Sequence, residues 1–180
     1  MTDLLTRDIW THGGGWPVPD LLKSCLGSLL LQKEIGRHVY FASPWITDFE
    51  LFDNRYNEYS FLFPEISDKD KIMFTDYLGS LSKRTQVRIL TIRNARSENF
   101  LKDYRFRRNE NLLYKFGDNG FHEKGILAEF FYIEGSMNLT DHGVRVRGEK
   151  VVYHSVTGIR MPSKIAEAYL EIDRHWDTRG

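Results

Sequence analysis

The chain has 180 residues, enough for one domain that buries roughly 70% of the surface of its unfolded chain. Hydrophobic residues make up 41% and aromatic residues 14%, a composition that excludes a disordered chain. Lys and Arg (25) balance Asp and Glu (25), so no overall charge attracts the protein to nucleic acid or to an anionic membrane, and polyanion binding requires a local cluster of cations.

The chain contains a single cysteine, Cys25, which excludes a disulfide within the chain. Cys25 lies in an apolar stretch, so we expect a buried thiol in a protein of a reducing compartment, the cytoplasm. The first residues lack the basic start and apolar core of a signal peptide, and no apolar run reaches the roughly 18 residues that span a bilayer. We therefore expect no stable association with a membrane.

The first third of the chain predicts an arm, a helix and a strand. We expect residues 1–19 to form an N-terminal arm, with HGGGWPVP joining it to the body, and residues 20–180 to form a single domain. Apolar residues at helical spacing predict a helix that is capped by Asp20 and ends at Gly36. The stretch RHVYFASPWI predicts a buried strand, and the aromatic stretch 47–68 after it is predicted to be irregular.

Helical and strand patterns alternate in the rest of the chain. Helices are predicted over 68–84, 97–108 and 161–176. Strands are predicted over 86–92, 111–116, 122–129, 130–136 and 149–156. The order strand, helix, strand predicts a parallel pair with a right-handed crossover. The fold class is therefore α/β, a mixed sheet flanked by helices on both faces.

The stretch FHEKGILAEFFYIEGSMNLT carries the candidate site. In a strand, His122 and Lys124 lie on one face, where a histidine and an ammonium form a poor core but a good phosphate site. Histidine can attack phosphorus or transfer a proton. Across the expected hairpin, Gly135 lets the backbone come close, and Ser136 and Asn138 offer short polar donors. We expect these residues to converge on one pocket.

Two further residues are assigned to this pocket. An attacking histidine needs a carboxylate or carbonyl on its second ring nitrogen, and Glu149, at the start of a predicted strand, is the candidate. Trp45 follows the first strand, at the type of strand end that faces the ligand crevice of α/β sheets, although core packing is an alternative. The remaining histidines are scattered and form no metal-ligand set, so we expect no metal or other cofactor.

These residues resemble the HKD motif of the phospholipase D superfamily, whose common pattern is H-x-K-x4-D-x6-G-S-x-N. Here Glu129 replaces the aspartate, and five residues instead of six separate it from Gly135. Glu149, eleven residues past Asn138, is similar in placement to the acid that orients the histidine in that family. The stretches SPWI, DNR, HEKG and GSMNLT also resemble phospholipase-D-like proteins encoded with deazaguanine DNA-modification systems.

The resemblance implies a phospholipase-D-like fold and a metal-independent phosphodiesterase. The single H-x-K resembles the small one-motif bacterial members, which act as homodimers and include nucleases. It implies a homodimer with a shared active site, in which His122 attacks the phosphorus and forms a covalent phosphohistidine, and His122 of the partner subunit protonates the leaving oxygen. Lys124, Ser136 and Asn138 are then expected to hold the non-bridging oxygens.

A basic stretch before the site favours a nucleic-acid substrate. Arg105, Arg107 and Arg108 are interleaved by Tyr104 and Phe106, the composition of a nucleic-acid groove, although a solvated helix face is the ordinary alternative. We expect a nuclease that acts on DNA, with other proteins of a DNA-processing system as further partners. The alternatives are a non-catalytic nucleic-acid-binding or assembly subunit of a DNA-modification or defence system, and a lipid phosphodiesterase. Against the lipid substrate, the sequence shows no basic amphipathic helix and no lipidation signal.

Overall fold

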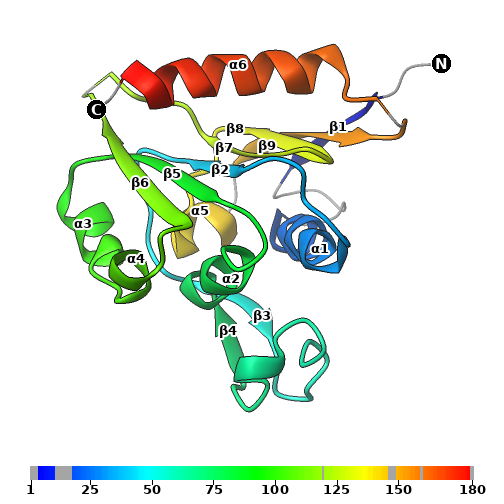
Figure 1. The fold of residues 1–180 in the computed structure, drawn as a ribbon, viewed down its shortest axis with the longest axis vertical. Coiled ribbons are helices and arrows are strands. Elements are labelled where there is room, and N and C mark those ends of the chain that lie inside the picture. The colour runs from blue at the N-terminus through cyan, green and yellow to red at the C-terminus, as the bar shows by residue number, and fades with distance from the viewer. Residues whose placement is uncertain (1–3, 11–17, 119, 146–148, 159, 179–180) are drawn as a thin grey trace.

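A seven-stranded mixed sheet forms the centre of the molecule, seen in a computed structural model that describes residues 4–10, 18–118, 120–145, 149–158 and 160–178 (Figure 1). In sheet order, the strands are β1 (Leu4–Trp10), β9 (Lys150–Val156), β8 (Phe131–Gly135), β7 (Gly125–Ala128), β2 (Val39–Ala42), β5 (Val87–Ile92) and β6 (Leu112–Gly117). A smaller sheet pairs β3 (Glu50–Asp53) with β4 (Lys71–Met73). This mixed α/β architecture confirms the predicted fold class.

Helices cover both faces of the sheet. The helices are α1 (Val18–Leu31), α2 (Phe74–Leu81), α3 (Ala95–Leu101), α4 (Arg105–Arg108), α5 (Asp141–Arg145) and α6 (Ser163–Thr178), with a 3-10 turn at Pro64–Ile66. Figure 1 shows α6 alone along one face, while α1, α2 and α5 lie against the other. Two buried clusters follow from this layering, the smaller one formed under α6 by Ile165, Tyr169 and Trp176 against Tyr40 and Leu127.

The centre of the sheet is apolar on both faces. All residues of β2 and β7 are buried, which explains why both strands appear in the sequence as continuous apolar runs. β2 pairs with β5 in parallel, as predicted from the strand–helix–strand order, and with β7 in antiparallel. Cys25 is buried in α1, and burial raises the pKa of its thiol to about 12, which makes it an unreactive core residue.

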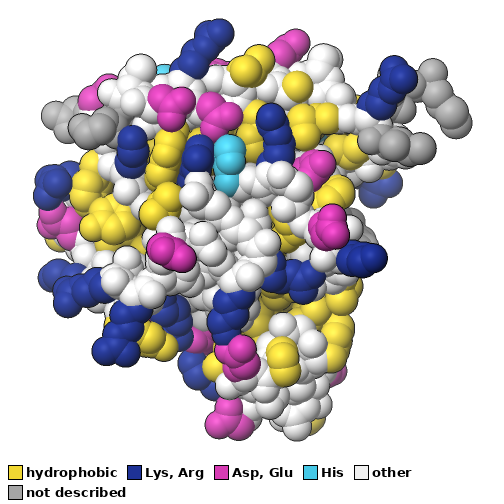
Figure 2. Space-filling model, in the orientation of Figure 1, with side chains coloured by type: hydrophobic (Ala, Val, Ile, Leu, Met, Phe, Trp, Pro, Cys, Tyr) yellow, Lys and Arg dark blue, Asp and Glu magenta, His cyan; other side chains and the backbone are white. Residues whose placement is uncertain are grey.

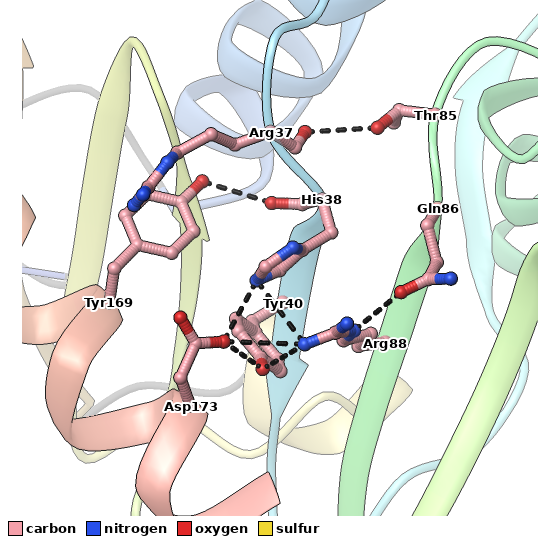
Figure 3. Close-up of polar contacts among 8 residues, drawn as sticks. All are labelled: Arg37, His38, Tyr40, Thr85, Gln86, Arg88, Tyr169 and Asp173. Carbon is pink, nitrogen blue, oxygen red and sulfur yellow. Dashed lines mark hydrogen bonds and ion pairs between the residues drawn. The ribbon is translucent and has the colours of Figure 1, made fainter. Parts of the chain in front are cut away.

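Five polar residues connect α6 to its face of the sheet (Figure 3). Tyr40 donates a hydrogen bond to Asp173 Oδ1 (2.6 Å), and His38 Nε2 lies 3.0 Å from the same oxygen. Arg88, on β5, donates to the Tyr40 hydroxyl (2.8 Å) and lies 3.3 Å from Asp173 Oδ1. One turn earlier, Tyr169 donates to the His38 carbonyl (3.0 Å). The helix is thus held to β2 and β5 by a shared carboxylate as well as by apolar packing.

The N-terminal half differs from the sequence expectation in several places. Residues 4–10, expected to belong to an arm outside the domain, form edge strand β1, which pairs along its full length with β9. The stretch 47–68 is not wholly irregular, because it contains β3. The first helix begins at Val18, so Asp20 lies in its first turn and does not cap it. The helix ends at Leu31, five residues before Gly36, whose backbone N–H donates instead to Glu129 (3.0 Å).

Two predicted helices are shorter than expected. The first residues of the 68–84 prediction form β4, since they pair with β3, and Asp76 accepts from the Met73 N–H (3.1 Å) where α2 begins. The helix predicted over 97–108 is divided into α3 and α4. Asp103 divides it, because its carboxylate accepts from the Arg105 backbone N–H (2.9 Å) and starts the second helix.

Candidate active site

The candidate residues gather at one end of the β7–β8 hairpin. The strand predicted over 122–129 begins only at Gly125, so His122 and Lys124 lie just before it and not on a strand face. The pairing of β7 with its neighbours stops at Gly125 because both neighbouring strands end at this level. Ala42, opposite Gly125, is the last residue of β2, and Gly135 is the last residue of β8. The predicted turn at the other end of the hairpin is confirmed.

Glycine is required at both strand ends for steric reasons. A Cβ on Gly125 would lie 2.4 Å from the carbonyl oxygen of Ile133 on β8. Gly135 has a φ of +149°, and a Cβ there would lie 2.2 Å from the carbonyl oxygen of Lys150. The two glycines therefore let the backbones of β7, β8 and β9 approach closely beside the candidate residues.

Ser136 joins the loop after β8 to the start of β9. Its backbone N–H donates to the Lys150 carbonyl (3.0 Å), and its hydroxyl accepts from the Lys150 N–H (3.0 Å). The same hydroxyl donates to the carboxylate of Glu149. Glu149 was expected to orient His122, but its carboxylate lies on Ser136, and the His122 ring has no hydrogen-bond partner among the residues that the structure describes. The orienting role of Glu149 stays a prediction.

A buried serine that the sequence reasoning missed positions Asn138. Ser43 follows β2 and is fully buried, and its hydroxyl donates to the Trp45 carbonyl (2.7 Å) and accepts from the Leu139 N–H (3.0 Å). The hydroxyl also lies 3.5 Å from Asn138 Oδ1. The signal for it in the sequence is a polar residue directly after a buried strand, but a Ser-Pro pair at that place is also typical of a simple turn.

The polar groups of the site are available to a ligand. The Lys124 ammonium contacts only the His122 carbonyl (3.4 Å) and has no carboxylate partner in the described part of the chain. Asn138 directs its carbonyl oxygen toward Ser43, which leaves its amide N–H groups as donors. His122 is exposed, and Trp45 is 48% exposed beside this loop, so it lies at the surface and not in the core. The arrangement presents one imidazole, one ammonium and one amide on an open surface.

The predicted basic residues lie elsewhere. Arg105 forms ion pairs with Asp76 and Asp103 and is 18% exposed, a structural role. Arg105 and Arg108 line a cavity of about 860 Å³ with Arg84 and Asn111, at the amino ends of β5 and β6 and therefore at the opposite edge of the sheet from the hairpin end. Arg107 lines a separate groove beside β6. None of the three therefore lies at the hairpin end, because α4 precedes the amino end of β6, and their assignment to a substrate groove stays a prediction.

Neither a metal site nor a spanning helix is found in the described ranges. No three His, Cys, Asp or Glu side chains of residues 4–10, 18–118, 120–145, 149–158 and 160–178 are grouped so that they could hold a metal ion. No helix within these ranges has the length and apolar composition needed to cross a bilayer.

No protein-family model and no curated protein sequence matches the chain. The fold of the chain does resemble that of several solved structures. NucT from Helicobacter pylori has a TM-score of 0.61 at 12% identity and matches over 98% of both chains. Nuc from Salmonella typhimurium, a phospholipase D family member, has a TM-score of 0.58 at 14% identity over 98% of this chain and 97% of its own. TrmBL2, an archaeal DNA-binding chromatin protein, has a TM-score of 0.50 at 12% identity over 97% of this chain and 53% of its own. The chain thus has the phospholipase-D-like fold.

Proposed function

We propose that the protein is a metal-independent phosphodiesterase, and more narrowly a nuclease that acts on DNA. The observation that carries this proposal is the gathering of His122, Lys124, Ser136 and Asn138 at one hairpin end, in a fold that a phospholipase D family member shares. An imidazole beside a cation and an amide donor suits a phosphodiester, whose transition state places charge on the non-bridging oxygens.

The reaction proceeds in two steps. A ring nitrogen of His122 attacks phosphorus, the bond from phosphorus to the leaving oxygen breaks, and His122 of the partner subunit donates a proton to that oxygen. Water then attacks the phosphorus and gives a proton to His122 of the partner subunit, and the bond from phosphorus to the His122 nitrogen breaks, which restores both rings. Lys124, Ser136 and Asn138 hold the non-bridging oxygens in both steps. Proton transfer by a positioned group contributes roughly 10²–10⁴-fold to the rate.

The open site supports the proposal of a homodimer. The chain carries one H-x-K, and the exposed His122 lies on a surface that a second copy can cover. A two-fold contact between hairpin ends supplies the second histidine without further sequence. Within each subunit, Glu149 orients His122, and its hydrogen bond to Ser136 keeps the carboxylate beside the hairpin end.

DNA is the favoured substrate because the narrower resemblance is to proteins of deazaguanine DNA-modification systems, and the protein acts there together with other components in the cytoplasm. The specific alternative is a non-catalytic DNA-binding subunit. It is favoured by the His122 ring having no orienting partner among the described residues and by the likeness to TrmBL2, a chromatin protein that binds DNA. A lipid phosphodiesterase is the weaker alternative.

A cleavage assay distinguishes these functions. The wild type and His122→Ala are incubated with labelled single- and double-stranded DNA, with RNA, with bis(p-nitrophenyl) phosphate and with phosphatidylcholine vesicles, each with excess EDTA. We expect DNA cleavage by the wild type that EDTA does not reduce and that His122→Ala lacks. Salt-sensitive DNA binding without cleavage of any substrate indicates the non-catalytic subunit, and cleavage of the vesicles alone indicates the lipid enzyme.

A further inference from the structure

A groove runs beside β6, the edge strand of the large sheet. It has a volume of about 470 Å³ and is bounded by β6, α3 and α4. We call it the β6 groove, and its side chains that bear on the argument are Arg93, Lys102, Phe106, Arg107, Tyr114 and Phe116. Figure 2 shows Lys and Arg side chains next to hydrophobic ones on this side of the molecule. The groove is distinct from the cavity that contains Arg105 and Arg108.

The β6 groove is a local cluster of cations on a neutral protein. Arg93, Lys102 and Arg107 are exposed, and Glu98 is the carboxylate that lines the groove with them. Lys102 and Arg107 have no carboxylate partner in the ranges that the structure describes, and the exposed pair of Arg93 with Glu98 (3.3 Å) is weak. In the larger cavity, by contrast, Lys83 and Arg105 are each paired with a carboxylate.

Aromatic rings line the same groove. Tyr114 and Phe116 are two residues apart on β6 and therefore lie on one face, with ring centroids 5.6 Å apart. Tyr114 is 41% exposed, and the guanidinium of Arg93 lies 4.4 Å from the Phe116 centroid. Phe106 contacts Tyr114 from α4 at 6.0 Å between centroids. The exposed ring of Tyr114, backed by the partly buried rings of Phe106 and Phe116, offers a stacking surface for a base that is not already stacked in a duplex.

One end of the groove adjoins the candidate active site. Arg93 directly follows β5, and the next residue, Asn94, donates to the Pro44 carbonyl (3.2 Å). Pro44 lies between Ser43, which contacts the Asn138 loop, and Trp45. The loop that carries Trp45 is thus hydrogen-bonded to the residue next to Arg93, which links the surroundings of the hairpin end with the β6 groove.

We propose that the β6 groove binds single-stranded nucleic acid, with Lys102 and Arg107 on phosphates and Tyr114 stacked on a base. This inference rests on the proposed function, since it extends the substrate path from that site. An apolar edge strand is also a surface on which a protein strand can add, but two exposed cations without carboxylate partners in the described ranges favour a polyanion over a polypeptide.

Binding of labelled oligonucleotides tests the groove. Fluorescence anisotropy follows a fluorescein-labelled dT20 strand and the dT20·dA20 duplex from low to moderate salt, in a His122→Ala background that prevents cleavage. The groove variant is Lys102→Gln with Arg107→Gln. The control, Lys83→Gln with Arg108→Gln, removes the same charge from exposed positions outside the β6 groove. Thermal unfolding checks that all variants are folded.

We expect the groove variant to bind dT20 at least tenfold more weakly than the control variant and to lower the slope of log K against log salt by about 1.4, or about 0.7 for each lost phosphate contact. Tyr114→Ala should weaken dT20 binding by about 5- to 100-fold, the loss of one stacked base, with a smaller effect on the duplex. Equal dT20 binding by the groove and control variants, or no dT20 binding by the parent, overturns the proposal in favour of a protein ligand.

A second readout separates this proposal from the proposed function. In the chain with intact His122, the groove variant should cleave bis(p-nitrophenyl) phosphate, which is too small to reach the groove, at the wild-type rate. If the wild type cleaves no substrate but dT20 binding still depends on the groove residues, the proposed nuclease function is contradicted and the proposed role of the β6 groove is supported. Wild-type DNA cleavage that the groove variant retains in full contradicts the groove alone.

Discussion

At the scale of single residues, local spacing predicted the hairpin at whose end the candidate residues lie. The hairpin was readable from alternating apolar residues around a turn, so the proximity of Lys124 to Gly135 and Ser136 followed from pairing alone. Contacts that depend on the conformation of loops could not be predicted from the sequence. Ser43 and Leu139 are far apart in the chain, and the hydroxyl of Ser136 competes for the carboxylate assigned to His122.

Ser43→Ala tests the buried hydroxyl that supports Asn138. Its loss leaves the Leu139 N–H, in a buried loop, without an acceptor, which costs about 1–3 kcal/mol of stability. We also expect kcat to fall several-fold with KM nearly unchanged, because the Asn138 amide is no longer held in place. Urea denaturation and steady-state kinetics measure the two effects. Ser28→Ala, whose hydroxyl donates only to a carbonyl within α1, is the control, and equal losses in both variants would contradict the assignment.

Glu149→Gln tests the orienting carboxylate. We expect the rate to fall at least tenfold, while the Kd for DNA changes less than twofold, because the side chain acts on the histidine and not on the substrate. The pH profile of kcat should move as well, since a neutral amide supports the imidazolium less well than a carboxylate does. Glu167→Gln, which replaces an exposed acid of α6, is the control. An unchanged rate and profile would remove Glu149 from the mechanism.

At the scale of elements, long periodic patterns were sufficient to predict a helix or strand, whereas short segments were not. Helix α6 was predicted from one apolar stripe, and its buried residues are Ile165, Ala168, Tyr169, Ile172 and Trp176. Strands β3 and β4 have four and three residues and exist because they pair with each other, which no local pattern reveals. The break between α3 and α4 likewise depends on one side-chain contact, made by Asp103.

The polar contacts that hold α6 to the sheet, which include His38, predict a pH dependence of stability. Burial and the neighbouring Arg88 lower the pKa of His38 below its ordinary value of 6.5, against the opposite effect of Asp173. The unfolded chain therefore binds a proton more readily than the folded one, and stability is full above pH 6.5 and falls as the pH drops toward the folded-state pKa.

Urea denaturation at pH 7.5 and pH 5.5 measures this effect. We expect the loss of unfolding free energy between these two values to be smaller in His38→Gln than in the wild type, because the titrating group is gone. His142→Gln, which replaces an exposed histidine of α5, should keep the wild-type difference. The same loss in His38→Gln as in the wild type would show that another group causes the pH dependence.

At the scale of the whole molecule, the fold class was predictable and the placement of surface charge was not. Alternating helices and strands specified a mixed sheet, but the basic stretch 93–108 was divided among a structural ion pair, a cavity and the β6 groove, a division that depends on where α3 and α4 turn. A neutral net charge does not oppose the approach of two copies, which the proposed active site requires.

Mixed dimers test the shared site. Wild type and His122→Ala are unfolded together, refolded at several ratios and assayed at constant total protein. If both copies of His122 serve one phosphorus, hybrids are inactive and activity falls with the square of the wild-type fraction. Light scattering on the same samples should give the mass of a dimer. A linear fall in activity, or full activity at the mass of one chain, would show that each chain works alone.

The covalent intermediate is the most direct test of the central claim, that His122 attacks phosphorus. A labelled oligonucleotide is mixed with enzyme in excess, quenched in alkaline denaturant, which preserves phosphohistidine, and the digested protein is examined by mass spectrometry. We predict a nucleotide adduct on the peptide that contains His122, formed in the presence of EDTA, absent from His122→Ala and lost on longer incubation before the quench. Cleavage of the oligonucleotide without an adduct, or with an adduct on another residue, would contradict the proposed mechanism.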